Sequence, residues 1–206
     1  MTKRNSTSIN PSVQHKRTVY GVGYNSKGNH VRSVDGVTTY AYNTWKAMLE
    51  RCYSARLQKK YPTYKGCLVD SRWHDYQVFA EWIKNNKYYG LGYHLDKDIL
   101  IKGNKIYSPE TSCLIPKEIN KLLNDRGNAR GEMPTGVYFN KNRCKIQSQI
   151  SINGRTVSLG VFDCADAAHE AYVKRKEAYV KEKAIEWKDR IPSSVFDALM
   201  IWSFND

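Results

Sequence analysis

Apolar residues recur at helical spacing in the first half of the chain. One predicted helix begins after a cap at Asn43 or Thr44, and its buried face follows i, i+3, i+4, i+7 spacing: Trp45, Met48, Leu49 and Cys52. A second helix is predicted from about residue 75 to 85, where aromatic and aliphatic residues again fall mostly on one face. Before them, Asp35-Gly36 predicts a tight hairpin.

The second half alternates apolar and polar residues with the period of a strand. Strands are predicted at residues 135–139, 143–152 and 155–162, and Asn153-Gly154 between the last two is a strong hairpin signal. A long helix is predicted to start at an Asp163 cap and to run through Ala184. These elements predict a three-stranded antiparallel sheet packed on one helix.

Between the two regions, the pattern predicts a short strand at residues 113–115 and a helix at 117–124. The Gly-rich, polar stretch that follows, residues 125–134, is the predicted domain boundary. We therefore expect an α+β protein with three parts: a basic flexible arm (residues 1–19), a central module (20–128), and a C-terminal module with a tail (129–206).

The strand predicted at residues 143–152 has two chemically different faces, because side chains alternate along a strand. One face is mostly apolar and would pack on the helix, whereas the other is basic and amide-rich: Arg143, Lys145, Gln147, Gln149 and Ser151. Arg can pair with guanine and Gln with adenine, so this face has the chemistry to contact base edges, and Lys141 and Arg155 could add phosphate contacts. An ordinary solvated sheet face shows the same pattern.

The net charge of the chain indicates which kind of molecule it binds. The chain has 33 Lys and Arg against 20 Asp and Glu, a net charge of +13, which favours a polyanion. Residues 1–34 contain six of these bases and no acid, and could follow a phosphate backbone or be an ordinary mobile terminus. Because 41% of the residues are hydrophobic and 12% are aromatic, the chain is not a disordered basic tail.

The cysteines and the apolar runs argue against a disulfide-rich protein, a zinc finger and a membrane protein. Five cysteines without a C-x-x-C pair argue against a disulfide framework or a zinc finger and favour buried free thiols. The polar N-terminal residues do not resemble a signal peptide, and the longest apolar run, residues 195–204, is too short to span a membrane. We expect no membrane partner and a cytoplasmic protein.

The C-terminal module resembles the plant Apetala/ethylene-response-factor type of DNA-binding domain, which also occurs beside phage nucleases. The resemblance is carried by three stretches: TGVYF at 135–139, NGRTVSLGVF at 153–162, and the alanine-rich helix with Ala167, Ala168, Ala171 and Tyr172. It implies that the sheet enters the major groove of double-stranded DNA. The contacts it implies, taken with the polar face, give the candidate residues Tyr138, Lys141, Arg143, Lys145, Gln147, Gln149 and Arg155. Cys144 stands where the family has Trp.

The central module resembles phage HNH endonucleases of the free-standing, homing type. The matching segments are W-x-x-M-L-x-R-C-Y at 45–53, the run from Tyr61 to Trp82, and L-D-K-D-I followed by G-N-x-x-Y-S-P-E and P-x-x-I-N at 95–120. The resemblance implies a degenerate ββα-metal fold that hydrolyses DNA phosphodiester bonds with one divalent metal. In a bacterial host, such a phage protein would act in the cytoplasm.

The resemblance also implies site residues. Lys97 stands where the family has its catalytic His. His94 lies on the same side of a strand as Asp96 and could take the place of that His. The catalytic candidates are therefore His94, Asp96 and Lys97. Candidate ligands for Mg²⁺ or Mn²⁺ are Asp96, Asp98 and Asn120, since oxygen donors suit these ions. Thr111 replaces the loop Asn of the family.

The two resemblances and the candidate residues lead us to expect one of two functions. The first is a metal-dependent DNA endonuclease, acting as a monomer or homodimer without a small-molecule cofactor. The second is a catalytically inactive, sequence-specific DNA-binding protein on the same scaffold, because a fold can persist without its activity.

Overall fold

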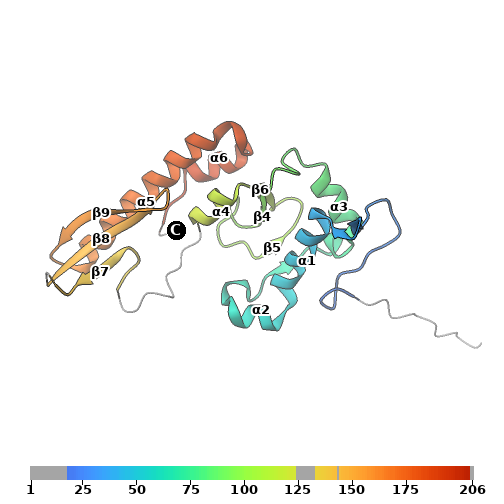
Figure 1. The fold of residues 1–206 in the computed structure, drawn as a ribbon, viewed down its shortest axis with the longest axis horizontal. Coiled ribbons are helices and arrows are strands. Elements are labelled where there is room, and N and C mark those ends of the chain that lie inside the picture. Colours follow the sequence, from blue (N-terminus) through green and yellow to red (C-terminus); the bar gives the residue numbers. More distant parts are fainter. Residues whose placement is uncertain (1–17, 124–132, 143, 205–206) are drawn as a thin grey trace, which may run out of the picture.

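The computed structural model describes residues 18–123, 133–142 and 144–204, and is α+β (Figure 1). Most of the predicted arm, most of the predicted boundary and Arg143 lie outside these residues. The described residues form six α-helices: α1 (Tyr40–Tyr53), α2 (Ala55–Lys60), α3 (Tyr76–Lys84), α4 (Lys117–Leu123), α5 (Ala165–Trp187) and α6 (Ser193–Met200). Short 3₁₀ helices lie at η1 (Pro62–Tyr64), η2 (Ser71–His74) and η4 (Lys188–Arg190).

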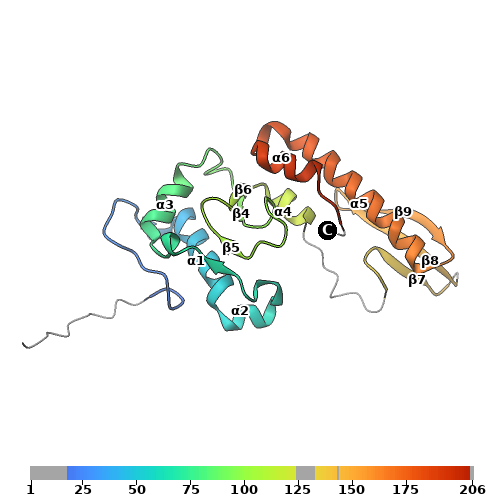
Figure 2. The same cartoon turned by 180° about the vertical axis from the view of Figure 1, so that it is seen from behind.

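The strands form one three-stranded sheet and three two-stranded pairs. Strands β7 (Val137–Asn140), β8 (Lys145–Ile152) and β9 (Arg155–Phe162) make the antiparallel sheet in the order β7-β8-β9. The pairs join β1 (Ser33–Val34) with β2 (Val37–Thr38), β3 (Leu68–Val69) with β5 (Ile106–Tyr107), and β4 (His94–Asp96) with β6 (Cys113–Ile115). Figures 1 and 2 show helices α1 to α3 at one end, the sheet at the other, and β4, β6 and α4 between them.

Helix α1 begins earlier than the sequence pattern predicts. The cap is Thr39, whose side-chain oxygen accepts a hydrogen bond from the Tyr42 backbone N–H, so the prediction of Asn43 or Thr44 was wrong. The apolar face from Trp45 to Cys52 is buried as predicted. Helix α3 is confirmed, and Asp75 caps it by accepting from the Gln77 N–H. An aromatic core that includes Trp45, Trp73 and Phe79 holds these helices together.

The β4–β6 pair separates this core from a second one. Leu95 and Leu114 are paired across the two strands and belong to the aromatic core. Cys113 and Ile115, on the opposite side of β6, belong to the second core, which also includes residues of α4, α5 and α6. Because the second core joins residues 113–122 to residues 179–199, α4 is packed directly on the C-terminal helices.

The antiparallel sheet packed on one helix is confirmed. Asn153 and Gly154 both have positive φ, 50° and 78°, as a two-residue hairpin requires. Ile150 and Ser148 are buried beneath the helix side of β8, while Lys145 and Gln149 are exposed on the other side. Asp163 was wrongly predicted as the cap of α5: Cys164 holds that position without a side-chain hydrogen bond, and the helix continues to Trp187.

The prediction of buried thiols is confirmed for three cysteines and wrong for two. Cys52, Cys67 and Cys113 are buried, whereas Cys144 and Cys164 are exposed, and all five are free. Cys144 lies in the turn before β8 and Cys164 in the cap before α5, so neither reaches a core. None of the described helices is long and apolar enough to cross a membrane.

Gly136 lies just before β7 and packs closely against Tyr172, so a larger residue there should destabilise the fold measurably. A Cβ atom there would lie 2.1 Å from Cδ2 of Tyr172, and its φ is +82°. We expect Gly136→Ala to lower the free energy of unfolding by about 2 kcal/mol, through backbone strain and the clash together. Gly154→Ala is the matched control, because Gly154 has φ +78° but open space around it. It should cost about 1 kcal/mol in urea unfolding, and equal costs would contradict the clash.

Candidate active site and nucleic-acid interface

The pairing of β4 with β6 places His94 and Asp96 on one side. His94 is opposite Ile115 and Asp96 is opposite Cys113, so all four side chains lie on the side of the second core. Helix α4 starts two residues after β6 and packs over the same side, because Ile119 and Leu122 are buried in that core. His94 is exposed and Asp96 is partly buried.

Asp96 ends β4 and holds the turn that follows. Its Oδ1 atom accepts hydrogen bonds from the backbone N–H groups of Asp98 (3.0 Å) and Ile99 (2.9 Å). Burial, followed by the negative charge of Asp98, raises the pKa of Asp96 to about 6. Because the charges of Asp96 and Asp98 repel each other, a cation bound between the two carboxylates would stabilise them both.

Lys97 points away from His94 and Asp96. It is 5% exposed, and its Nζ atom lies 5.8 Å from the ring centre of Tyr107, in the aromatic core. Its ammonium donates to Oδ2 of Asp98 over 2.8 Å. The structure therefore brings His94 and Asp96 to one side and places Lys97 beside Asp98.

Hydrogen bonds from the Asn104 amide and the Thr111 hydroxyl order the loop between β4 and β6. Asn104 donates through Nδ2 to the carbonyl oxygens of Lys97 (2.6 Å) and Ile106 (2.8 Å), which fixes the backbone just after Asp96. Thr111 donates to the Ile106 carbonyl over 2.9 Å and orders the loop before β6. Sequence reasoning did not assign Asn104 a role, although it belongs to the G-N-x-x-Y-S-P-E segment.

All three predicted metal ligands, Asp96, Asp98 and Asn120, line one cleft of about 1250 Å³. Within residues 18–123, 133–142 and 144–204, no group of three or more His, Cys, Asp or Glu side chains is close enough to hold a metal. Two carboxylates and an amide nevertheless fit Mg²⁺, which binds hard oxygen donors and keeps several waters.

Positive charge surrounds His94. Burial, and then the charges of Lys117, Arg51 and Lys121, lower the pKa of His94 below its ordinary value. The imidazole is therefore mainly neutral at neutral pH, the form that can accept a proton. Sequence reasoning missed these three cations. The i, i+4 spacing of Lys117 and Lys121 was a usable signal for two of them.

The open face of the sheet carries the remaining candidates. Lys141, Lys145, Gln149 and Arg155 are exposed, whereas Gln147 is 7% exposed. The Gln147 side-chain oxygen accepts hydrogen bonds from the Tyr138 hydroxyl (2.5 Å) and from Nδ2 of Asn140 (3.1 Å). Gln147 therefore orients Tyr138, and the most accessible amide on this face belongs to Gln149.

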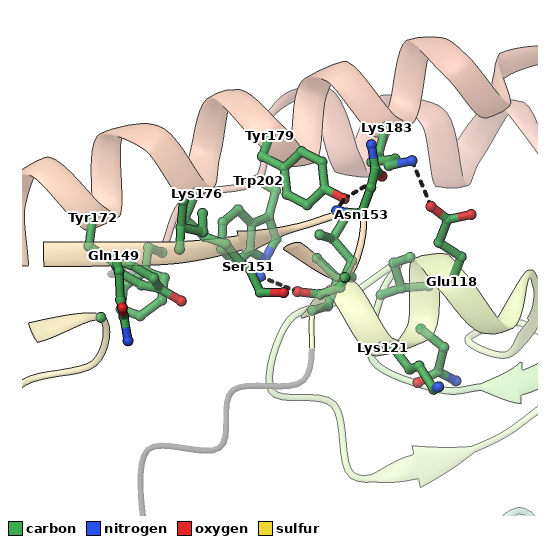
Figure 3. Close-up of a pocket in the computed structure, with 18 of the residues that line it drawn as sticks. Glu118, Lys121, Gln149, Ser151, Asn153, Tyr172, Lys176, Tyr179, Lys183 and Trp202 are labelled. Atoms are coloured by element: carbon green, nitrogen blue, oxygen red, sulfur yellow. Dashed lines mark hydrogen bonds and ion pairs between the residues drawn. The ribbon is translucent and has the colours of Figure 1, made fainter. Parts of the chain in front are cut away.

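Part of each group of candidates lines the cleft, whereas the other candidates among the described residues do not line it: His94, Lys97, Lys141, Lys145, Gln147 and Arg155. Tyr138, Gln149 and Ser151 of the sheet line it together with Asp96, Asp98 and Asn120, and Lys102, Lys121 and Lys176 add positive charge. Figure 3 shows Tyr179 and Lys183 of α5 reaching toward Asn153 and Glu118, and Lys121 on the far side of α4. The contacts are a hydrogen bond from the Tyr179 hydroxyl to Asn153 (3.0 Å) and an ion pair from Lys183 to Glu118 (2.6 Å).

Comparison of the chain with known protein families, with curated proteins and with solved structures finds no match.

Proposed function

We propose that the protein is a metal-dependent endonuclease that hydrolyses phosphodiester bonds of double-stranded DNA. The observation that carries the proposal is the shared cleft: one wall has the predicted metal ligands, and the other has Tyr138, Gln149 and Ser151 of the polar sheet face. The order of strand, loop, strand and helix in β4, β6 and α4 agrees with an HNH-like arrangement. The net charge of +13 favours a nucleic acid as substrate.

The chain's own residues divide the chemistry between them. His94, whose pKa is lowered, accepts a proton from the attacking water. Asp96 and Asp98, with Asn120, would hold the Mg²⁺ or Mn²⁺ ion. When bound, the ion stabilises the charge that develops on the phosphoryl oxygens. Gln149, which lines the cleft, and Lys145, at the start of the same strand, would keep the duplex in place.

A supercoiled plasmid tests this function directly. The purified chain is incubated with plasmid in Mg²⁺, in Mn²⁺ and in EDTA, and the nicked and linear forms are separated on a gel. We expect nicking with either metal and none in EDTA. If the plasmid stays supercoiled in both metals, the endonuclease proposal fails.

A second function has one observation in its favour. Lys97 stands at the position of the family's catalytic base, and its ammonium is already paired with Asp98, a predicted metal ligand. This arrangement supports a DNA-binding protein that does not cut. Binding to a DNA duplex without metal-dependent nicking would favour this second function.

The sheet face gives a prediction about affinity that both functions share. Lys145→Ala should reduce the slope of log affinity against log salt by about 1, because one phosphate contact is lost. Lys181→Ala is the control: it removes the same charge from an exposed position on α5, the helix on the other side of the sheet. Fluorescence anisotropy with a labelled duplex measures both slopes. Equal slopes for the two variants would contradict a DNA contact at Lys145.

A further inference from the structure

Arg51 is a cation without an acidic partner beside the candidate site. It lies in the last turn of α1, next to the buried residues Leu49 and Cys52. Its guanidinium carbon is 5.8 Å from the ring centre of Tyr64, and Nη1 is 3.4 Å from the Tyr107 hydroxyl. The two aromatic side chains hold the guanidinium in one place.

The pairing of Arg51 differs from that of Arg72. Arg72 is half exposed, and it donates to Asp70 and Glu110 through four hydrogen bonds of 2.8 Å. Across residues 18–123, 133–142 and 144–204, no carboxylate oxygen lies within 4.0 Å of an Arg51 nitrogen. Burial alone would lower the pKa of Arg51, but Tyr107, Tyr64 and the charge of Asp96 raise it, so the guanidinium stays charged although no carboxylate pairs with it directly.

The free N–H groups of Arg51 are open to a ligand. In the part of the chain that the structure describes, fully buried side-chain nitrogens without a partner occur in Trp73 and Trp187, and Arg51 has none. The donors that Tyr107 does not occupy therefore reach the accessible surface. The Tyr107 ring that bears this hydroxyl also lies 5.8 Å from Nζ of Lys97, and Lys97 donates to Asp98 over 2.8 Å. These contacts place the guanidinium near the end of β4, where its charge also acts on Asp96 and on His94.

We propose that Arg51 binds a phosphate of the nucleic-acid backbone beside His94 and Asp96. The planar guanidinium can donate two parallel hydrogen bonds to two oxygens of one phosphate, which a point charge cannot do. Lys117 and Lys121, exposed on α4, add positive charge around the same phosphate. This inference rests on the proposed function for the identity of the substrate, but phosphate binding at Arg51 does not require cleavage.

The experiment compares three variants of the full chain. Arg51→Met removes the positive charge and keeps most of the aliphatic part of the side chain. Arg51→Lys keeps the charge but removes the planar guanidinium with its paired N–H donors. Lys46→Met removes an exposed charge from the same helix and is the control. Each is tested for plasmid nicking and for the salt slope of binding to a labelled duplex. Thermal unfolding of each variant checks that it is folded.

We expect Arg51→Met to reduce the salt slope by about 1 and to lower the nicking rate at saturating DNA at least about tenfold. Arg51→Lys should keep the slope and still lower the rate, and Lys46→Met should change neither. If the wild-type chain never nicks but Arg51→Met reduces the slope, the endonuclease proposal fails and the phosphate site stands. If folded Arg51→Met keeps the wild-type slope, the phosphate site is overturned, whatever the nicking rate.

Discussion

Asp96→Asn should abolish metal-dependent nicking and at the same time make the protein more stable. The amide oxygen of Asn can still accept from the Asp98 and Ile99 N–H groups, so the turn after β4 is kept. The negative charge, which burial and Asp98 oppose, is removed. Loss of a charged metal ligand should lower the nicking rate by about a hundredfold or more.

The stability gain depends on pH in a defined direction. The pKa of Asp96 rises from 3.8 to about 6 in the folded protein, so the folded state binds more protons than the unfolded state between these values. Stability should therefore fall as pH increases from 4 through about 6. At pH 7 in EDTA, Asp96→Asn should raise the free energy of unfolding by about 2–3 kcal/mol, since one pKa unit corresponds to about 1.4 kcal/mol. Below pH 4 the gain should disappear.

Asp98→Asn is the matched control for this prediction. It also removes one of the two carboxylates, but it leaves buried Lys97 without its ion-pair partner at 2.8 Å. We expect it to be less stable than wild type, since an unpaired buried charge is costly. Urea unfolding at pH 4 and pH 7 measures both variants. A loss of stability for Asp96→Asn at pH 7 would show that its charge is compensated in the folded state.

Much of the fold follows from local signals in the sequence. The Asn153-Gly154 turn sets the β8–β9 hairpin, because both residues adopt positive φ. The cap at Asp75 and the apolar face of α3 locate that helix. Prediction failed where tertiary contacts decide the ends of an element. Helix α1 extends back to Tyr40, whose ring packs edge-on against Tyr89, and α5 runs to Trp187, which packs against both cores.

The candidate site could be predicted only in part, for a physical reason. Alternation along β4 places His94 and Asp96 together, which requires no knowledge of the rest of the fold. The position of Arg51 depends on how α1 packs against Tyr64 and Tyr107, residues far away in the chain. The cleft depends on the packing of α4 on α5, which joins residues on either side of the predicted boundary. Periodicity contains no signal for either arrangement.

The contact between α4 and α5 gives the second large effect on stability. Lys183 of α5 is 5% exposed, and its Nζ atom lies 2.6 Å from Glu118 of α4 and 2.8 Å from Glu186. Burial disfavours the charged ammonium, but the hydrogen bonds that Lys183 donates to the two glutamates outweigh burial and raise its pKa. The two carboxylates are therefore the counter-charges of this buried ammonium.

The double variant Glu118→Gln, Glu186→Gln should therefore lower the free energy of unfolding by about 3 kcal/mol at neutral pH, because it leaves a buried charge without a counter-charge. Lys183→Met should cost about 1 kcal/mol or less, since the stem still fills the interface and the two glutamates, each about half exposed, are solvated instead. Urea unfolding of both variants, with each single glutamine variant between them, measures the difference. If Lys183→Met costs as much as the double variant, the ion pairs themselves stabilise the contact between α4 and α5, and the expected asymmetry is wrong.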